Sequence, residues 1–144
     1  MTLLTPSLHE VLNAGHLVHL VTVNEDGSPQ LSVIWVGTEG DEIVSAHIPA
    51  HQKLYKKLRN IQRDPRVSLS LEIDGDNGIG MANHLVIEGK ATVTEGGAPE
   101  LLHRLAQVYI GPGAKFPPTD SPLPGYVVHI VPEKIRGLSP LLDG

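Results

Sequence analysis

The 144-residue chain contains no cysteine, and only 3% of its residues are aromatic. Without cysteine it has no disulfide, no thiolate metal ligand and no cysteine nucleophile. No apolar run is long enough to cross a bilayer, and no basic stretch with an apolar core follows Met1, so we expect neither a membrane span nor a signal peptide. These absences favour a cytoplasmic protein, and the length predicts one domain over residues 1–144.

Basic residues are scarce but concentrated. The chain has eleven Lys and Arg against sixteen Asp and Glu, a net charge of −5. Six of the basic residues share residues 53–66 with one acidic residue: Lys53, Lys56, Lys57, Arg59, Arg63 and Arg66. This segment therefore carries +5 and the rest of the chain −10. Such a distribution disfavours nucleic acid as a partner and favours one small anionic ligand, although a run of charge is equally typical of a solvated helix face.

Alternating and β-branched residues predict strands over most of the chain. We expect strands at residues 16–23, 30–36, 42–47, 66–73, 84–95 and 126–131, with residues 133–138 extending the last one. Residues 24–27 are a turn signal that joins the first two strands into a hairpin, and Gly89 predicts a bulge. Six or seven antiparallel strands cover their edges best in a closed or nearly closed barrel, so the expected fold is mainly β with inserted helices.

Helices are predicted at residues 7–14, 50–62 and 99–109. In the second, Leu54, Leu58 and Ile61 recur at helical spacing and form an apolar stripe. Lys53 and Lys57 would lie one turn apart beside this stripe and reach a ligand held at the sheet.

A long irregular loop is predicted at residues 111–125, where eight positions are Pro or Gly. Loops of this length are uncommon in compact domains and are often functional. We therefore expect this loop to lie near the ligand and to influence substrate turnover more than cofactor affinity.

The eight histidines do not form a recognised metal motif. His16 and His19 would point to opposite faces of a strand, and Pro49 separates His47 from His51. The pattern therefore predicts no metal site.

Other ligand motifs also fail at defined positions. The Asp- and Gly-rich residues 74–78 suggest a calcium loop, but Leu85 stands where the twelfth ligand, a Glu, is required. Residues 78–80 lack the third glycine of a dinucleotide loop.

Several segments, taken in order, resemble a known family. They are DGSPQLSVIW at 26–35, the strand from residue 42, KLRNIQRDPRV at 57–67, IEGKATVT at 87–94, EGGAPELL at 95–102 and YIGPGAKFPP at 109–118. Together they resemble the flavin-binding split-barrel superfamily of pyridoxamine 5'-phosphate oxidase, and within it the deazaflavin (F420)-dependent oxidoreductases. The resemblance implies a six-stranded split β-barrel (the FMN-binding split barrel) and a homodimer with two cofactor sites at its interface.

Residue by residue, the resemblance also implies a cofactor site. The positions that would run along the tricyclic ring are Gln30, Ser32, Val33, Ile34 and Trp35. Lys57 would contact the cofactor phosphate, and Arg59 and Lys53 would also bind the cofactor, although members of the family differ in length over residues 51–56. Met81, Ala82 and Asn83 would reach the ring from the partner subunit. The pattern contains no universal general acid, so no catalytic residue is assigned.

The function implied is that of an F420-dependent reductase, an enzyme. Reduced deazaflavin would deliver a hydride to an electron-poor C=C or C=N bond of a small organic substrate, while the protein orients the cofactor and excludes water. The alternatives are an FMN-binding oxidoreductase on the same fold, or a non-catalytic flavin- or haem-binding protein. A true pyridoxamine 5'-phosphate oxidase is disfavoured, because the chain lacks the C-terminal Arg-x-His pattern expected for the substrate phosphate.

Overall fold

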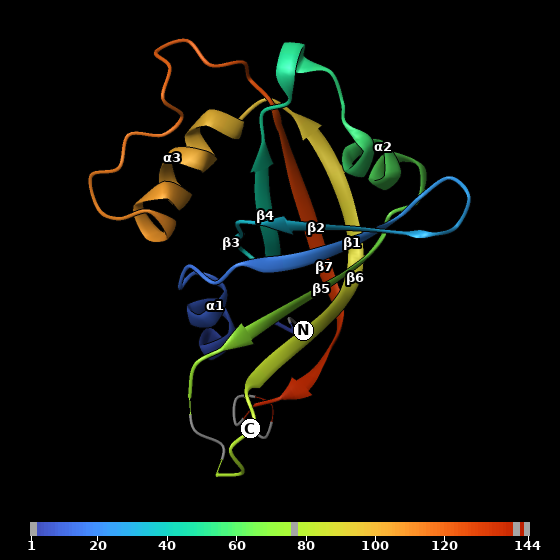
Figure 1. The fold of residues 1–144 in the computed structure, drawn as a ribbon, viewed down its shortest axis with the longest axis vertical. Helices are drawn as coiled ribbons and strands as arrows, with labels where there is room; N and C mark the ends of the chain where they lie inside the picture. Colours follow the sequence, from blue (N-terminus) through green and yellow to red (C-terminus); the bar gives the residue numbers. More distant parts are fainter. Residues whose placement is uncertain (1–2, 76–77, 140–141, 143–144) are drawn as a thin grey trace.

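The computed structural model describes residues 3–75, 78–139 and 142 (Figure 1). Its elements in chain order are α1 (Pro6–Leu12), β1 (Val18–Val23), β2 (Pro29–Ile34), β3 (Gly37–Glu39), β4 (Glu42–His47), a 3-10 turn (Ala50–Gln52), α2 (Lys56–Arg63), β5 (Arg66–Ile73), β6 (Asn83–Glu95), α3 (Ala98–Tyr109) and β7 (Tyr126–Leu138). Every predicted strand is present, with ends that differ by at most two residues. The segment expected to extend the last strand is part of a continuous β7.

The strands form one seven-stranded antiparallel sheet in the order β2-β1-β5-β6-β7-β4-β3. The long β6–β7 pair runs the length of the molecule, and β1, β2 and β5 cross it (Figure 1). This arrangement confirms the mainly β, split-barrel fold class. The register of β6 against β7 shifts at Gly89, as predicted, and a Cβ there would overlap the carbonyl oxygen of Val131.

The main core lies inside the curved sheet. In β5, Val67, Leu69 and Leu71 are buried and alternate with half-buried serines. Ile87 of β6 and Ile130 of β7 are fully buried in the same cluster. The alternation read from the sequence therefore places the side chains of β5 on the correct faces.

A second core cluster lies between the sheet and α3. Leu101 and Leu105 of α3 are buried against Val44 of β4 and Val127 of β7. This packing fixes α3 on β4, on the outside of the barrel (Figure 1). None of the helices within the described ranges has the length and apolar character needed to span a membrane.

The helix predicted over residues 50–62 is interrupted. A 3-10 turn ends at Gln52, residues 53–55 are not helical, and α2 starts at Lys56. The reason is tertiary: the Gln52 amide donates to the Gly125 carbonyl (2.9 Å) and accepts from its N–H (2.8 Å), and Tyr126 Oη donates to the Gln52 carbonyl (2.8 Å). Lys53 therefore lies outside the helix, and the prediction that it sits one helical turn from Lys57 is wrong. The apolar stripe is confirmed for Leu58 and Ile61, which are buried, whereas Leu54 lies before α2 and packs against the core only partly buried.

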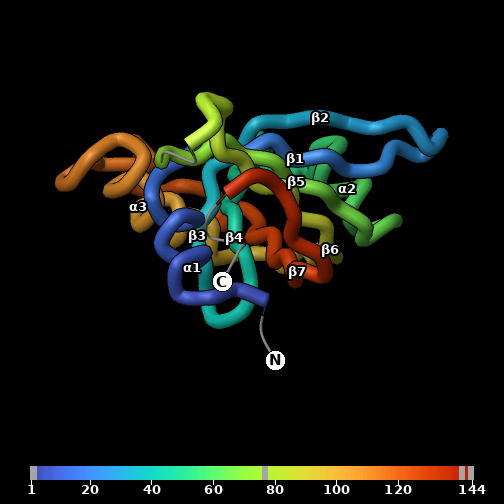
Figure 2. The backbone as a smooth tube through the Cα atoms, turned by 90° about the horizontal axis from the view of Figure 1, so that it is seen from below, coloured from blue at the N-terminus to red at the C-terminus, as the bar shows by residue number. Residues whose placement is uncertain are grey.

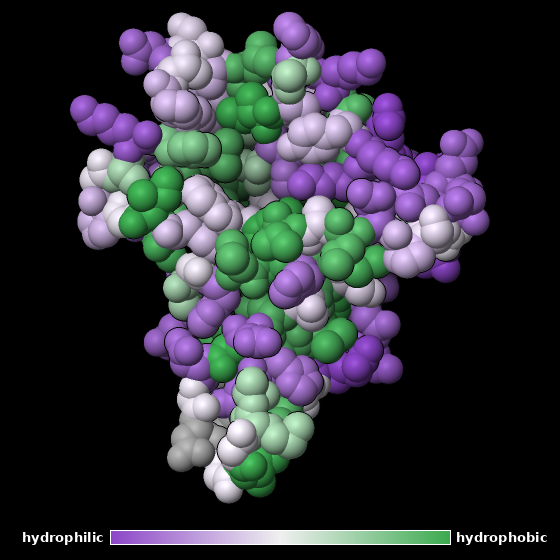
Figure 3. Space-filling view, viewed as in Figure 1, coloured by the Kyte–Doolittle hydropathy of each residue, from purple (hydrophilic) through white to green (hydrophobic). Residues whose placement is uncertain are grey.

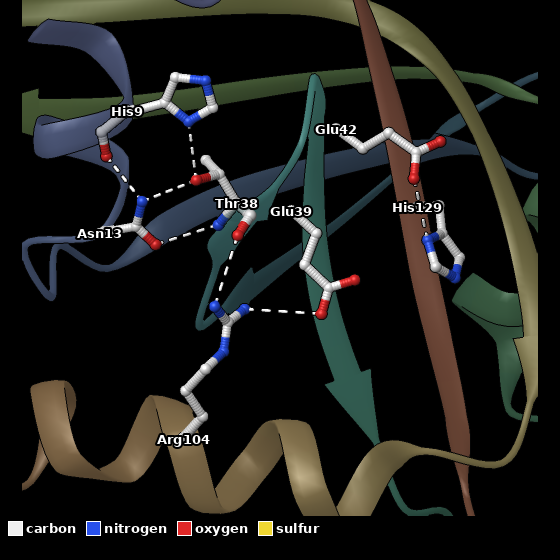
Figure 4. A network of polar contacts seen from close by, with 7 residues as sticks. All are labelled: His9, Asn13, Thr38, Glu39, Glu42, Arg104 and His129. Atoms are coloured by element: carbon white, nitrogen blue, oxygen red, sulfur yellow. Dashed lines mark hydrogen bonds and ion pairs between the residues drawn. The ribbon is translucent and has the colours of Figure 1, made fainter. Parts of the chain in front are cut away.

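The three-residue strand β3 was not predicted, because it is too short to show an alternating pattern. A polar network ties it to α1 and α3 (Figure 4). Asn13 Nδ2 donates to Thr38 Oγ1 (2.7 Å), and the Thr38 N–H donates to Asn13 Oδ1 (3.0 Å). On the other side, Arg104 of α3 lies 3.8 Å from Glu39. These contacts hold both helices against one edge of the sheet.

Candidate functional site

A cleft opens where β4 ends, between the start of α2, the helix α3 and the loop at residues 111–125. It consists of two adjoining cavities of about 520 and about 210 Å³. Both are lined by the same four residues, Ala46, His47, Leu102 and Phe116. The smaller cavity continues to Val33, Ile34, Trp35 and Lys57, and the larger one lies under the loop. The predicted loop therefore does lie beside the predicted ring-binding strand.

Another hollow, of about 580 Å³, lies on the opposite part of the sheet around Val21 and Ser68. Its two basic residues, Arg66 and Lys134, are accompanied by Glu88 and by a second glutamate. It contains no aromatic side chain, so it offers neither a stacking surface nor an excess of positive charge. The cleft at the end of β4 has both an aromatic stacking surface, at Trp35, and an excess of positive charge, at Lys57.

Trp35 forms one wall of the cleft and is held rigidly. It stacks on Tyr109 of α3, with ring centroids 4.9 Å apart and planes 8° from parallel, and Phe116 lies 5.7 Å away at a tilt. Tyr109 Oη donates to the His16 carbonyl (2.6 Å) and accepts from the Val36 N–H (3.0 Å). Burial raises the pKa of Tyr109, so its hydroxyl remains a donor at neutral pH.

His47 lies at the junction of the two cavities and is buried. Its Nε2 is 2.9 Å from the hydroxyl of Ser45, two residues back on the same face of β4. Burial, assisted by the positive charge of Lys57, lowers the pKa of His47 to about 3. The imidazole is therefore neutral across the physiological range, and Tyr55 packs against it edge-on with centroids 6.2 Å apart.

Lys57 supplies positive charge to the smaller cavity. Its Nζ lies 5.3 Å from the centre of the Tyr55 ring, and burial lowers its pKa. It belongs to the first turn of α2, which contains no acidic residue and has no side-chain cap. Free N–H groups and lysines at a helix N-terminus favour a bound anion, because both the helix dipole and the lysine charges are then compensated.

The predicted β2 residues lie at the edge of the sheet, because β2 is the first strand in the sheet order (Figure 2). Gln30, Ser32 and Ile34 lie on its inner face, and Val33 lies on the outer face, 54% exposed. The hydroxyl of Ser32 is buried and makes no hydrogen bond within the described residues. Neither Gln30 nor Ser32 lines the cleft, so of the predicted β2 residues the structure brings only Val33, Ile34 and Trp35 to it.

The predicted cationic residues do not all reach the cleft. Lys53 and Arg59 are exposed and do not line it. Arg63 donates to the Val23 carbonyl, and Arg66 forms a 2.7 Å ion pair with Asp64. These last two side chains are used to hold the chain together, so the segment offers a ligand fewer free cations than its +5 suggests.

Met81, Ala82 and Asn83 lie far from the cleft within one chain. They precede and start β6 at the lower end of the molecule, whereas α2 lies near its top (Figure 1). The Asn83 amide donates to the Gly75 carbonyl over 2.9 Å. Any contact of these residues with a ring at Trp35 therefore requires a second chain.

An apolar face suited to such a second chain covers β2, β1 and β5, where hydrophobic residues gather at the centre of Figure 3. Leu31 and Val33 of β2 are 61% and 54% exposed, and Leu17, just before β1, is 58% exposed. Patches of this kind commonly mark interfaces.

Sequence reasoning missed several residues of the cleft. His47 and Tyr55 were not chosen, although a histidine at the end of a buried strand is an available signal. Phe116 was included only as part of the loop. No group of three or more metal-binding side chains is found among the described residues, and residues 76–77 of the calcium-like loop lie outside them.

Comparison with known proteins agrees with the fold described above. A family profile described as pyridoxamine 5'-phosphate oxidase matches residues 4–138. No curated protein matches the sequence. A solved F420 reductase is similar with a TM-score of 0.69 and 24% identity, covering 89% of this chain and 94% of that one. A conserved hypothetical protein from Mycobacterium tuberculosis is similar with a TM-score of 0.68 and 26% identity, covering 96% of this chain and 86% of that one. A haem storage protein from Vibrio cholerae is similar with a TM-score of 0.60 and 15% identity, covering 96% of each chain. At 24% and 15% identity, the first and third likenesses are those of the fold alone.

Proposed function

The chain belongs to the pyridoxamine 5'-phosphate oxidase family, and from this membership we propose that it is an F420-dependent reductase of small organic molecules. The observation that carries the proposal is the junction of three features at one cleft. These are the uncapped, lysine-bearing start of α2, the end of the edge strand β2 at Val33 and Ile34, and the aromatic wall at Trp35.

Each feature suits one part of a flavin-like cofactor. Lys57 and the N–H groups of the first α2 turn would bind its phosphate. The end of β2 from Val33 to Trp35 would lie along the ring, offering backbone donors to its polar edge. When bound, reduced deazaflavin supplies a hydride, which suits an electron-poor C=C or C=N bond. The chain's own contribution is to orient the ring against Trp35 and to exclude water with the loop at residues 111–125.

The remaining cations support F420 over FMN. Lys53, Lys56 and Arg59 surround the start of α2, and within the described part of the chain none of them forms an ion pair. FMN has one phosphate and no acidic tail, so these side chains would be surplus to it. The carboxylates of an F420 tail give them a partner.

We further propose a homodimer formed through the apolar face around Leu31 and Val33. Pairing would bury this face and would allow Met81, Ala82 and Asn83 of the partner subunit to approach the ring. Obligate interfaces commonly bury more than ~2,000 Å² in total, and an apolar strand face is suited to this.

The test is a titration of the purified protein with F420 and with FMN, followed by absorbance and fluorescence. Wild type is compared with Lys57→Ala, Lys53→Ala and the control Lys90→Ala, an exposed lysine on β6 paired with Glu133. Lys57→Ala should weaken both cofactors by about one to two powers of ten, since a charge-assisted hydrogen bond contributes roughly 1.5–3 kcal/mol. Lys53→Ala should weaken F420 alone, and the effect should shrink as salt rises.

Two results would contradict the proposal. Tight FMN binding by wild type, with F420 no better than micromolar to millimolar, would favour the FMN-dependent alternative. An unchanged affinity for both cofactors in Lys57→Ala would remove the start of α2 from the site. Lys90→Ala should behave as wild type throughout.

A further inference from the structure

The larger cavity of the cleft differs in chemistry from the smaller one. Its walls are mostly apolar: Ile48, Leu102, Phe116 and Leu123 together with three prolines of the loop. Its polar side chains are His47, Tyr55, Thr119 and Ser121, and no Lys, Arg, Asp or Glu lines it. The volume of about 520 Å³ is that of a site for a small organic molecule.

Positive charge stops at the boundary between the two cavities. Lys57 lines the smaller cavity but not the larger one. A phosphate or carboxylate placed under the loop would lose water without gaining a counter-ion, which is strongly unfavourable. A neutral molecule has no such cost, and it gains from covering the apolar walls.

His47 provides one directed polar contact at this boundary. Ser45 holds its Nε2 at 2.9 Å, and the ring makes no other hydrogen bond within the described residues, so Nδ1 is available to a molecule in the cleft. Because the imidazole is neutral, it exchanges a hydrogen bond with a carbonyl, hydroxyl or N–H group rather than pairing with an ion. Its position next to both cavities places this contact at the end of the substrate nearest the ring.

We propose that the larger cavity is the substrate site and takes a neutral, mainly apolar molecule with a polar group that contacts His47. The inference rests on the proposed reductase function and adds a substrate class to it. It also excludes phosphorylated substrates from this cavity. His47 then determines specificity, because it favours substrates with a polar group that can exchange a hydrogen bond with its ring.

The experiment measures binding to the cofactor-free protein by calorimetry and by two-dimensional NMR. The chain's single tryptophan, Trp35, gives one indole N–H signal beside the cleft, and the backbone amides of Thr119, Ser121 and Leu123 report the larger cavity. The probes share one ring system: 2-acetylnaphthalene, 2-ethylnaphthalene, 2-naphthoate and 2-naphthyl phosphate. At the larger cavity, followed by the amides of Thr119, Ser121 and Leu123, we expect the two neutral probes to bind at least tenfold more tightly than the two anions. An anion bound only at Lys57 should leave these three amides unshifted.

Two variants test the assigned contacts. His47→Phe keeps an aromatic ring but loses the hydrogen bond, so 2-acetylnaphthalene should bind about 3- to 10-fold more weakly while 2-ethylnaphthalene is little changed. Thr119→Lys, at an exposed loop position, adds a cation to the cavity and should strengthen 2-naphthyl phosphate relative to wild type. Equal losses for both neutral probes in His47→Phe would overturn the role of His47.

The cofactor separates this inference from the proposed function. If 2-acetylnaphthalene and the cofactor bind together, the two cavities are distinct sites and the inference stands. If either displaces the other, or if 2-naphthyl phosphate occupies the larger cavity of wild type more tightly than the neutral probes do, the inference is wrong even where cofactor binding is tight. If the neutral probes bind as expected and neither F420 nor FMN binds at all, the proposed function fails while the chemistry of the cavity remains as assigned.

Discussion

Acidification should destabilise the fold through one side chain, His47. The ring is buried beside Ser45 and Lys57, and its pKa is lowered from 6.5 to about 3. Below pH 6.5 the unfolded chain binds a proton at this position that the folded chain refuses. The stabilising contribution is therefore complete above about pH 6.5 and is lost as the pH falls toward 3.

The size of the effect follows from these two values. Between pH 7 and pH 5 the unfolded state goes from about one quarter to almost fully protonated at this position, while the folded state remains almost unprotonated. Linkage then gives a loss of about 2 kcal/mol in the free energy of unfolding over this interval. The loss hardly changes if the folded pKa is taken as one unit higher, because pH 5 still lies above it.

The assay is chemical denaturation at a fixed protomer concentration and several pH values from 5 to 7.5, for wild type and His47→Gln. Glutamine does not titrate, so the variant should lose about 2 kcal/mol less than wild type between pH 7 and pH 5. Leu102→Ala is the control, because this residue lines the same cavities without titrating. It should lower stability at every pH and keep the wild-type pH dependence.

The reasoning would be refuted if the free energy of unfolding fell by the same amount between pH 7 and pH 5 in wild type and in His47→Gln. Such a result would mean that the folded state accepts a proton at His47 as readily as the unfolded chain does. The ring could not then be the neutral, desolvated group assigned to the cleft.

Four further predictions concern stability, assembly and the loop. Asn60→Ala should lower the free energy of unfolding by about 1–3 kcal/mol in urea denaturation, because its buried amide donates to side chains at the end of β1; an unchanged midpoint would contradict this. Gly125→Ala should cost about 1–3 kcal/mol in the same assay, because φ is +62° there and a Cβ would overlap the His47 carbonyl. Leu31→Lys should convert the proposed homodimer to monomer in light scattering, and a wild-type monomer at micromolar concentration would refute the dimer itself. Deleting residues 115–122 should change substrate turnover more than cofactor affinity, and the reverse result would separate the loop from the substrate.

Much of the scaffold could be predicted because its signals are local. Strict alternation in residues 66–73 identified β5 and its buried face, and the turn at residues 24–27 identified the β1–β2 hairpin. In the turn, Gly27 has φ of +87° and its N–H donates to the Asn24 carbonyl over 2.8 Å. A strand or turn of this kind depends on a few neighbouring residues, so the local sequence is sufficient to predict it.

The sequence likewise determined where positive charge and the apolar helix stripe occur. It did not determine which cations remain free. Arg63 and Arg66 are occupied by a carbonyl of β1 and by Asp64, and Lys53 is held outside α2 by the contacts of Gln52 with residues 125 and 126. The pair of Arg66 with Asp64 is local, but the contacts of Arg63 and Gln52 join residues about 40 to 70 positions apart, and no local pattern encodes them.

The cleft itself was decided only by the tertiary structure. Trp35, His47 and Phe116 come from the end of β2, the end of β4 and a proline-rich loop, and the second core cluster under α3 brings these segments together. The neutrality of His47 has the same origin, since desolvation depends on everything packed around the ring and not on its neighbours in sequence. Local periodicity therefore determined the barrel, whereas long-range packing determined which side chains meet at its end and in which charge state.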